Sequence, residues 1–550
     1  MKIIVLWTFV FIWLSSFTQV APNKYYIELR DKSNNLYSLD NPEEFLSERA
    51  LQRRANQNIM LDYSDLPLSQ VYIDSLKTFN ISILNVSKWF NSVLVYAENP
   101  ETIDSIKNLD FVNNTLKFEI KNDNKLAVDS KYKFLPEIKK VEQSDSYYDY
   151  GPSADQIFML NGHELHNRGY RGQGMLVAIT DAGFKGLPNM PSLEHVFNEN
   201  RLIATRNFVH GGDSVFAYST HGMRVFSILA GNSEGNLIGT APEADYVLLM
   251  SEDPDSENLI EEINWVSAAE FADSIGVDII NVSLGYLDFD MEENNHTYQD
   301  MDGETSIISV AAHTASQKGM LVVVAAANSG DDHEHPWIAS PGDAKDVITA
   351  GAVWSNQSYA SFSSIGPSYD GRIKPDLMAM GAGTYNQELT GDFGYGNGTS
   401  FSAPLLAGMF ACLWQQFPNK TNFEIMEVAK QSASLYNEPN EFMGYGIPDF
   451  YLASQILISG KENFEIKKLS VNPNPFNRDF NINLNNNIGD EIIITIADTL
   501  GRKNYIWYKL TASEDNQKVN ISDLSDLKPG SYIVKVSVNS VKYSTKLIKQ

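Results

Sequence analysis

The sequence predicts an α/β fold whose main sheet is mostly parallel and covered by helices on both faces. Residues 150–455 alternate short apolar runs with longer helical patterns. Continuous apolar runs of strand length are typical of parallel strands, because such strands are buried on both faces of the sheet. The strand candidates are residues 175–180, 246–250, 277–283, 320–326 and 347–353, and the helix candidates are residues 221–230, 260–274, 305–318 and 400–416.

Two regions of different character precede and follow this predicted domain. Residues 21–145 combine strand-like runs (24–29 and 92–96) with charged helical stretches and end in a polar, charge-rich segment, which predicts an α+β region and an exposed linker. Residues 465–550 contain short runs in which every second residue is apolar, separated by turn residues. This pattern predicts a small β-sandwich.

The first 20 residues are typical of a secretory signal peptide. Lys2 is followed by an apolar run from Ile3 to Leu14 and then by small or polar residues. The run is too short to span a bilayer as a helix, and the alternative is a buried first strand. We therefore expect an exported protein with no transmembrane segment in its mature form.

The composition argues against some classes of partner. The chain has 550 residues and a formal net charge of −27. A charge of this sign disfavours nucleic acid and anionic lipid surfaces as partners. The single cysteine, Cys412, lies in an apolar stretch. It can form no intramolecular disulfide, and we expect a small buried side chain there.

Four polar residues stand at the ends of predicted strands or the starts of predicted helices. Asp181 and Asn328 each follow an apolar strand run, and His221 and Ser400 each lie at the start of a helix pattern. In a parallel sheet, the carboxyl ends of the strands meet at one edge, where ligands bind. Residues 398–404 (GTSFSAP) present the Ser400 hydroxyl at a helix N-terminus, where the helix dipole favours a developing oxyanion.

These residue types fit nucleophilic catalysis. A serine hydroxyl needs a base within hydrogen-bond reach, and His221 could take its proton and return it to the leaving amine. Asp181 could hold the imidazole in the required tautomer. The Asn328 amide and the Ser400 backbone N–H could bind the oxyanion. Each motif alone is equally typical of a strand-end turn or a helix cap, so the prediction rests on all four in order.

Read together, these motifs resemble those of the subtilisin-like serine peptidases of the S8 family, which share the chain order Asp, His, Ser. The resemblance covers residues 150–450. It implies a secreted serine endopeptidase that hydrolyses peptide bonds of a protein or peptide substrate through an acyl-enzyme and requires no cofactor. It also implies that substrate lies along two segments, Ser283, Leu284 and Gly285 on one side and Ala325, Ala326 and Ala327 on the other.

The chain departs from the family pattern at four positions near these motifs. Ala182 replaces a hydroxyl residue, Met223 and Arg224 replace a threonine and a second histidine, and Ala327 replaces a glycine. None of these changes removes a member of the triad. The methyl group of Ala327 predicts a narrowed primary pocket and a preference for small or medium apolar P1 residues.

The flanking regions also carry resemblances. Residues 21–145, between a signal peptide and a hydrolase, resemble the pro-region of a secreted peptidase; the alternative is a retained N-terminal domain. Residues 465–550 resemble the C-terminal sorting domains of the type IX secretion system, through the motifs at 473–476 (PNPF), 498–502 (DTLGR) and 530–536 (GSYIVKV). This implies export through the periplasm of a Gram-negative bacterium to the medium or the cell surface. The alternative is a binding sandwich without an export role.

Metal binding and function leave alternatives open. Residues 331–335 (DDHEH) are either a metal cluster or a solvated loop, and the metal ligands stay unassigned. Structural calcium is common in the family, and residues 232–236 (NSEGN) carry oxygen ligands. The main alternative function is a catalytically silent surface binding protein, or adhesin, on a peptidase fold. A maturation enzyme acting on one partner is a further alternative.

Overall fold

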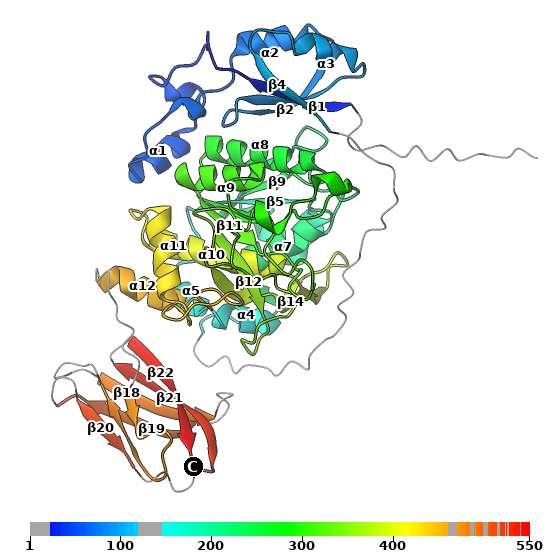
Figure 1. The fold of residues 1–550 in the computed structure, drawn as a ribbon. Coiled ribbons are helices and arrows are strands. Elements are labelled where there is room, and N and C mark those ends of the chain that lie inside the picture. Colours follow the sequence, from blue (N-terminus) through cyan, green and yellow to red (C-terminus); the bar gives the residue numbers. More distant parts are fainter. Residues whose placement is uncertain are drawn as a thin grey trace, which may run out of the picture. The chain divides into compact units, whose positions relative to one another are not determined.

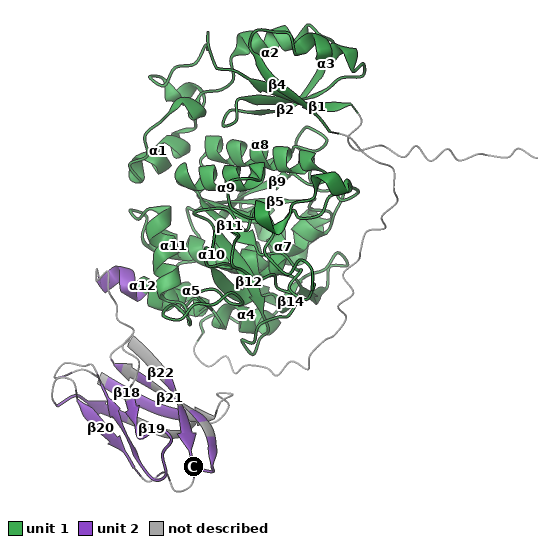
Figure 2. Cartoon of the chain, in the orientation of Figure 1, with its two compact units in different colours: residues 1–454 green, residues 455–550 purple. Residues whose placement is uncertain are grey.

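The computed structural model describes residues 23–118, 146–459, 470–484, 489, 491–498, 504–513, 517–522, 524, 527–538 and 541–550. The chain forms two compact units, residues 1–454 and 455–550 (Figure 2). The predicted signal peptide lies outside the described residues, as does most of the predicted linker before residue 146. No described helix is long and apolar enough to cross a membrane.

The N-terminal region is an antiparallel sheet covered on one face by two helices, as the α+β prediction requires. The strands follow the order β2-β3-β1-β4. Alternate residues of β1, including Ile27, pack against the helices, while Tyr26 faces the opposite way and contacts α8 of the main domain at Ile260 and Ile263. The elements are β1 (Lys24–Leu29), β2 (Ser82–Ser87), β3 (Ser92–Tyr96), β4 (Val112–Lys117), α2 (Gln70–Lys77) and α3 (Glu101–Ile106).

A further helix of this region, α1 (Glu48–Asn56), lies outside its sheet and contacts the main domain. Arg49 donates to the carbonyl of Gly174 (2.8 Å), and Gln57 donates to that of Gly319 (2.7 Å). Both carbonyls lie two residues before a strand of the main sheet. We call residues 47–57 the α1 strap. The strap therefore binds the amino edge of the main sheet.

Buried charges hold the strap in place. The carboxylate of Asp273, on α8, accepts hydrogen bonds from Arg53 (2.6 Å), Arg54 (2.8 Å) and Lys88 (2.9 Å). Arg54 also pairs with Asp65 at 2.8 Å. The three cations come from the N-terminal region, so the two regions share one ion network.

The main domain contains a parallel seven-stranded sheet, and the predicted α/β class is confirmed (Figure 1). The strand order is β13-β12-β11-β10-β5-β9-β6, so the direction of winding reverses at β5. Ligand sites of such sheets lie outside the carboxyl ends of strands at the reversal. The strands are β5 (Leu176–Asp181), β6 (Leu202–Asn207), β9 (Asp245–Met250), β10 (Ile279–Val282), β11 (Leu321–Ala325), β12 (Ile348–Val353) and β13 (Leu377–Met380).

Helices cover both faces of this sheet (Figure 1). On one face, α8 and α9 share an apolar core with alternate strand residues such as Ala178, Val247 and Val322. On the other face, α7 and α10 pack against β5 and β11 and against each other. The helices are α4 (Ala154–Phe158), α5 (Gly162–His166), α6 (Glu194–Asn198), α7 (His221–Ala230), α8 (Leu259–Ile275), α9 (Ile307–Gln317), α10 (Thr399–Gln416), α11 (Asn422–Gln431) and α12 (Phe450–Ser459).

Two hairpins complete the main domain, β7 (Asn232–Ser233) with β8 (Leu237–Ile238), and β14 (Ala382–Gln387) with β15 (Phe393–Asn397). The second hairpin directly precedes α10. Cys412 is buried inside α10 and its thiol donates to the Thr240 carbonyl at 3.1 Å.

The second unit is a β-sandwich, as its alternating sequence predicts. One sheet has the order β16-β17-β20 and the other β19-β18-β21-β22. Ile492, Ile494 and Ile496 of β18 are buried with Phe480 and Ile482 of β17 in one core. The strands are β16 (Ser470–Asn472), β17 (Phe480–Asn483), β18 (Glu491–Asp498), β19 (Asn504–Thr511), β20 (Lys518–Ile521), β21 (Gly530–Val538) and β22 (Val541–Lys549).

Candidate active site

The structure pairs Asp181 with His221. Asp181 ends β5 and is 1% exposed, while His221 is the first residue of α7. The Nδ1 atom of His221 lies 2.9 Å from Oδ2 and 3.0 Å from Oδ1 of Asp181. Burial lowers the pKa of His221, but the charge and hydrogen bond of Asp181 outweigh it, so the pKa ends above 6.5. Within residues 146–459, no hydrogen bond is present at the second ring nitrogen, Nε2, which leaves it free to accept from a nucleophile.

Ser400 is the second residue of α10, next to this pair. Its backbone carbonyl accepts a hydrogen bond from Ser283 Oγ at 2.9 Å. The ring of the following residue, Phe401, lies 6.1 Å from the His221 ring, so the start of α10 faces the start of α7. Within residues 146–459, no hydrogen bond is present at Ser400 Oγ. Nucleophile–base hydrogen bonds are often long in unliganded enzymes and tighten with substrate.

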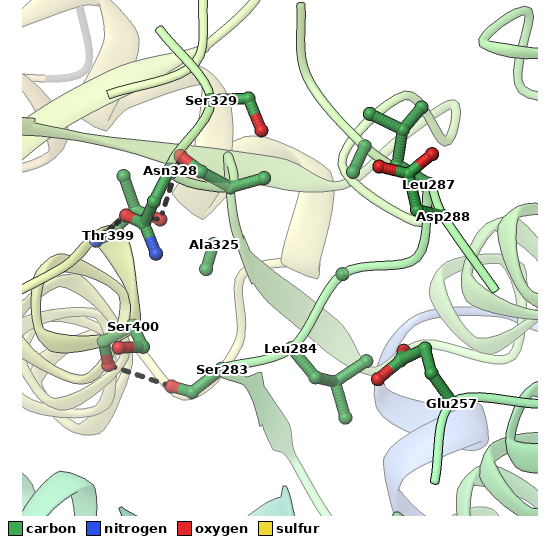
Figure 3. Close-up of a pocket in the computed structure, with 13 residues that line it drawn as sticks. Glu257, Ser283, Leu284, Leu287, Asp288, Ala325, Asn328, Ser329, Thr399 and Ser400 are labelled. Carbon is green, nitrogen blue, oxygen red and sulfur yellow. Dashed lines mark hydrogen bonds between the residues drawn. The ribbon is translucent and has the colours of Figure 1, made fainter. Parts of the chain in front are cut away.

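Asn328 follows β11 and directs its amide group toward the start of α10. Its Oδ1 atom accepts hydrogen bonds from the Thr399 backbone N–H (2.8 Å) and the Thr399 hydroxyl (3.1 Å). Because Oδ1 is engaged in this way, the Nδ2 donor faces Ser400 (Figure 3). Such an arrangement suits an oxyanion donor.

Gly398 keeps a small space open between these groups. Its φ of +149° is disfavoured for residues with a side chain. A Cβ atom at this position would lie 3.0 Å from Ser400 Oγ, 3.7 Å from Asn328 Nδ2 and 3.8 Å from the Ser400 backbone nitrogen. The predicted nucleophile and both predicted oxyanion donors therefore border one point.

A cavity of about 360 Å³ opens beside Ser400 (Figure 3). Five of the six predicted substrate-binding residues line it, but the sixth, Ala326, is fully buried and absent from the lining. Ala327 has a φ of +82°, an unusual value for a residue with a Cβ atom. The cavity is lined by Glu257, Ser283, Leu284, Gly285, Leu287, Asp288, Ala325, Ala327, Asn328, Ser329, Ala339, Thr399 and Ser400.

Acidic residues that were not predicted from the sequence flank the cavity. Glu257 and Asp288 are its acidic lining residues and lie across from Ser400 (Figure 3). Burial raises the pKa of Glu257 to about 9. Burial and the charge of Asp181 raise the pKa of nearby Glu252 to about 7. The acidic run at 251–257 (SEDPDSE), directly after a predicted strand, was the available signal.

The two predicted metal loops differ from a compact cluster of ligands. No group of three or more His, Cys, Asp or Glu side chains among the described residues is arranged to hold a metal ion. In the predicted calcium loop, Asn232 Oδ1 accepts from the guanidinium of Arg171 at 3.0 Å. That oxygen is therefore already engaged with a cation, and calcium at this loop stays a prediction. In the loop at 331–335, Asp332 accepts the backbone N–H groups of Glu334 and His335.

Fold and site together define an α/β protein with a serine, a histidine–aspartate pair and an amide donor at the carboxyl edge of a parallel sheet. The chain belongs to the subtilase family (Peptidase S8), whose family model matches residues 172–446, half of the chain. It is therefore a serine peptidase.

Two further family models match the flanking regions. Residues 24–133 match the Peptidase S8 propeptide domain of Bacteroidota, and residues 470–550 match a secretion system C-terminal sorting domain. The predicted resemblances to an S8 peptidase, its pro-region and a type IX sorting domain are thus confirmed. The sorting domain indicates export to the medium or the cell surface in Bacteroidota.

Several characterised proteins are similar to this chain. Subtilisin E from Bacillus subtilis (strain 168) is 26% identical over 323 residues, which cover 58% of this chain and 76% of that protein. Serine protease AprX from the same strain is 29% identical over 298 residues, 48% of this chain and 63% of that protein. Among solved structures, MycP1 from Mycobacterium smegmatis has a TM-score of 0.43 and 20% identity over 57% of this chain and 86% of that chain.

Proposed function

We propose that this protein is the precursor of an exported serine endopeptidase that cuts peptide bonds through an acyl-enzyme. The observation that carries the proposal is the point beside Gly398, which Ser400 Oγ, Asn328 Nδ2 and the Ser400 backbone nitrogen all border. The Asp181–His221 pair supplies the base next to it. A binding protein would have no need of this combination.

In the proposed reaction, Ser400 Oγ attacks the carbonyl carbon while His221 takes the hydroxyl proton through Nε2. Asp181 stabilises the resulting imidazolium. The Asn328 amide and the Ser400 N–H bind the oxyanion. The amine product leaves with the proton from His221, and water then releases the acyl group as a carboxylic acid. Every step uses side chains and backbone of this chain, without a cofactor.

The proposed substrate is an extended peptide lying along residues 283–285. Main-chain hydrogen bonds would supply affinity, and the side-chain pockets would supply selectivity. The methyl group of Ala327 borders the cavity, which supports a preference for small or medium apolar P1 residues. Strong cleavage after lysine or arginine would contradict this preference.

For export, we propose a signal peptide that directs the precursor to the periplasm and a C-terminal sorting domain that the type IX machinery then recognises. The matched sorting domain supports the second step. Mass spectrometry of the mature termini tests both steps, because each predicts loss of one end of the chain.

Fluorophosphonate labelling with mass-spectrometric mapping tests the proposed catalysis. We expect label at Ser400 in the wild-type protein and none in Ser400→Ala. Ser329→Ala is the matched control, because Ser329 also lines the cavity but has no proposed role in the chemistry. A folded, processed wild-type protein that stays unlabelled would favour the silent binding protein instead.

A further inference from the structure

Arg224 lies one helical turn beyond His221 on α7, on the same side of the helix. Its guanidinium binds the end of strand β14. The Nε atom donates to Asn386 Oδ1 at 2.9 Å, and Nη2 donates to Glu388 Oε1 at 3.0 Å. The Arg224 side chain is only 26% exposed. Two directed hydrogen bonds on a half-buried guanidinium fix its plane.

The same guanidinium packs over the ring of Phe401, 5.4 Å from its centroid. Phe401 follows Ser400 and is 3% exposed, and its ring is also the one that lies 6.1 Å from the His221 ring. Strand β15 closes this packing: a Cβ atom at Gly396 would lie 2.4 Å from the Phe401 ring and 3.1 Å from Arg224 Nη2. Arg224 therefore joins the helix of the base, the helix of the nucleophile and the β14–β15 hairpin.

The charge of Arg224 also acts on His221. Three ionisable groups influence the imidazole, each from a different element: Asp181 at the end of β5, Glu252 in the segment after β9, and Arg224 on α7. The two carboxylates favour the imidazolium, and the guanidinium disfavours it. Glu388 pairs with Arg224 from the hairpin.

We infer that Arg224 is a positioning residue of the active site. It holds the Phe401 ring between α7 and α10 and fixes the approach of His221 to Ser400. The inference rests on the proposed function, because it assumes that Ser400 is activated by His221.

The test is the rate of fluorophosphonate labelling at Ser400 against pH, measured on the full-length secreted protein. We expect Arg224→Met to lower the maximal rate between about 10- and 100-fold, the range for a misplaced catalytic group, and to move the acid-side midpoint to higher pH. Arg224→Lys keeps the positive charge but cannot make both hydrogen bonds to Asn386 and Glu388. It should therefore lower the labelling rate and leave the midpoint unchanged. Arg206→Met, at an exposed arginine, is the matched control and should change neither.

The outcomes separate this inference from the proposed function. Absence of label in the wild-type protein would refute the proposed function. Labelling of the wild type together with unchanged rate and midpoint in Arg224→Met would overturn the role of Arg224. If Arg224→Met does not fold, Arg224→Lys decides: a wild-type rate in that variant overturns the positioning role.

Discussion

Asn328 and Thr399 are joined by a hydrogen bond of 2.8 Å from the Thr399 backbone N–H to Asn328 Oδ1. Thr399 immediately precedes Ser400, so the turn that presents the proposed nucleophile also holds the proposed oxyanion donor. The two groups consequently keep their spacing even if α10 shifts slightly against the sheet.

Removal of the Asn328 amide should therefore slow the chemical step. We expect Asn328→Ala to lower kcat about 10²–10³-fold, the loss typical for an oxyanion-hole donor in subtilisin, with little change in KM. Thr399→Val removes the hydrogen bond from the Thr399 hydroxyl to Asn328 but keeps the one from the backbone N–H. We therefore expect it to lower kcat by about tenfold or less. Steady-state kinetics on a peptide substrate measures both, and an unchanged kcat in Asn328→Ala would remove Asn328 from the mechanism.

Gly398 should tolerate no side chain. In Gly398→Ala the new methyl would crowd Ser400 Oγ, so we expect labelling of Ser400 to be lost. Gly391→Ala is the matched control, because Gly391 also has a positive φ (+91°) but a Cβ atom there would have no neighbour within 4 Å. The control separates backbone strain from obstruction of the site. Equal labelling in the two variants would show that the space beside Gly398 is not used.

Ala327→Gly should relieve strain and widen the cavity together. A residue with a Cβ atom in the left-handed region costs about 1–3 kcal/mol, whereas the added freedom of glycine in the unfolded chain costs about 0.5–1 kcal/mol. We expect an unchanged or higher melting temperature and faster cleavage after large apolar P1 residues. Calorimetry and a P1 substrate series measure the two effects, and a P1 profile identical to that of the wild type would exclude Ala327 as a selectivity determinant.

Activity should fall on the acid side of a midpoint above pH 6.5. His221 acts as a base only when neutral, and its pKa is raised, so protonation on lowering the pH abolishes its function. The effect on folding stability has the opposite direction. Because the pKa of His221 is higher in the folded than in the unfolded protein, His221 stabilises the fold below its unfolded-state pKa, and this stabilisation is lost as the pH rises through its folded-state pKa. Glu252→Gln removes a carboxyl group whose ionised form favours the imidazolium, so the midpoint of kcat/KM should move to lower pH. A shift upward would contradict the assigned electrostatics.

Asp273→Asn should weaken the docking of the pro-region. Loss of one partner from a buried ion network typically costs about 3–5 kcal/mol, and Asp273 is fully buried among three cations. We expect a large drop in the yield of folded, secreted protein. Asp104→Asn is the matched control, because its pair with Lys107 is exposed and should contribute about 1 kcal/mol or less. A wild-type yield for Asp273→Asn would show that folding does not depend on this network.

Much of the fold could be predicted because the buried strands have a distinctive sequence. Strands β5 and β11 are continuous apolar runs, whereas the edge strand β6 contains Arg206 and was not predicted. Ala326 does not line the cavity, so its contact with substrate stays a prediction. Strand β11 ends at Ala325 and Ala327 has a positive φ, so the alternation of a strand does not extend to these residues, and only the structure shows that Ala325 and Ala327 line the cavity while Ala326 is buried.

The site could be predicted where topology alone brings residues together. Asp181 is the last residue of a strand that the sequence predicts. Residues at the carboxyl ends of parallel strands lie along the same edge of the sheet. The contacts of Arg224 could not be predicted, because they depend on a hairpin and on a ring from a third element. Glu257 and Asp288 lie on different loops, and only the folded chain shows that both border the same cavity.

The ion pair between Arg53 and Asp273 joins residues that are 220 positions apart. Cutting the chain between the pro-region and the catalytic domain would break one peptide bond, but it would leave the ion network around Asp273 intact. We therefore expect the two polypeptides of a chain cut there to stay associated. The catalytic domain would then become free of the pro-region only when the pro-region dissociates or is degraded, and not at the moment of the cut.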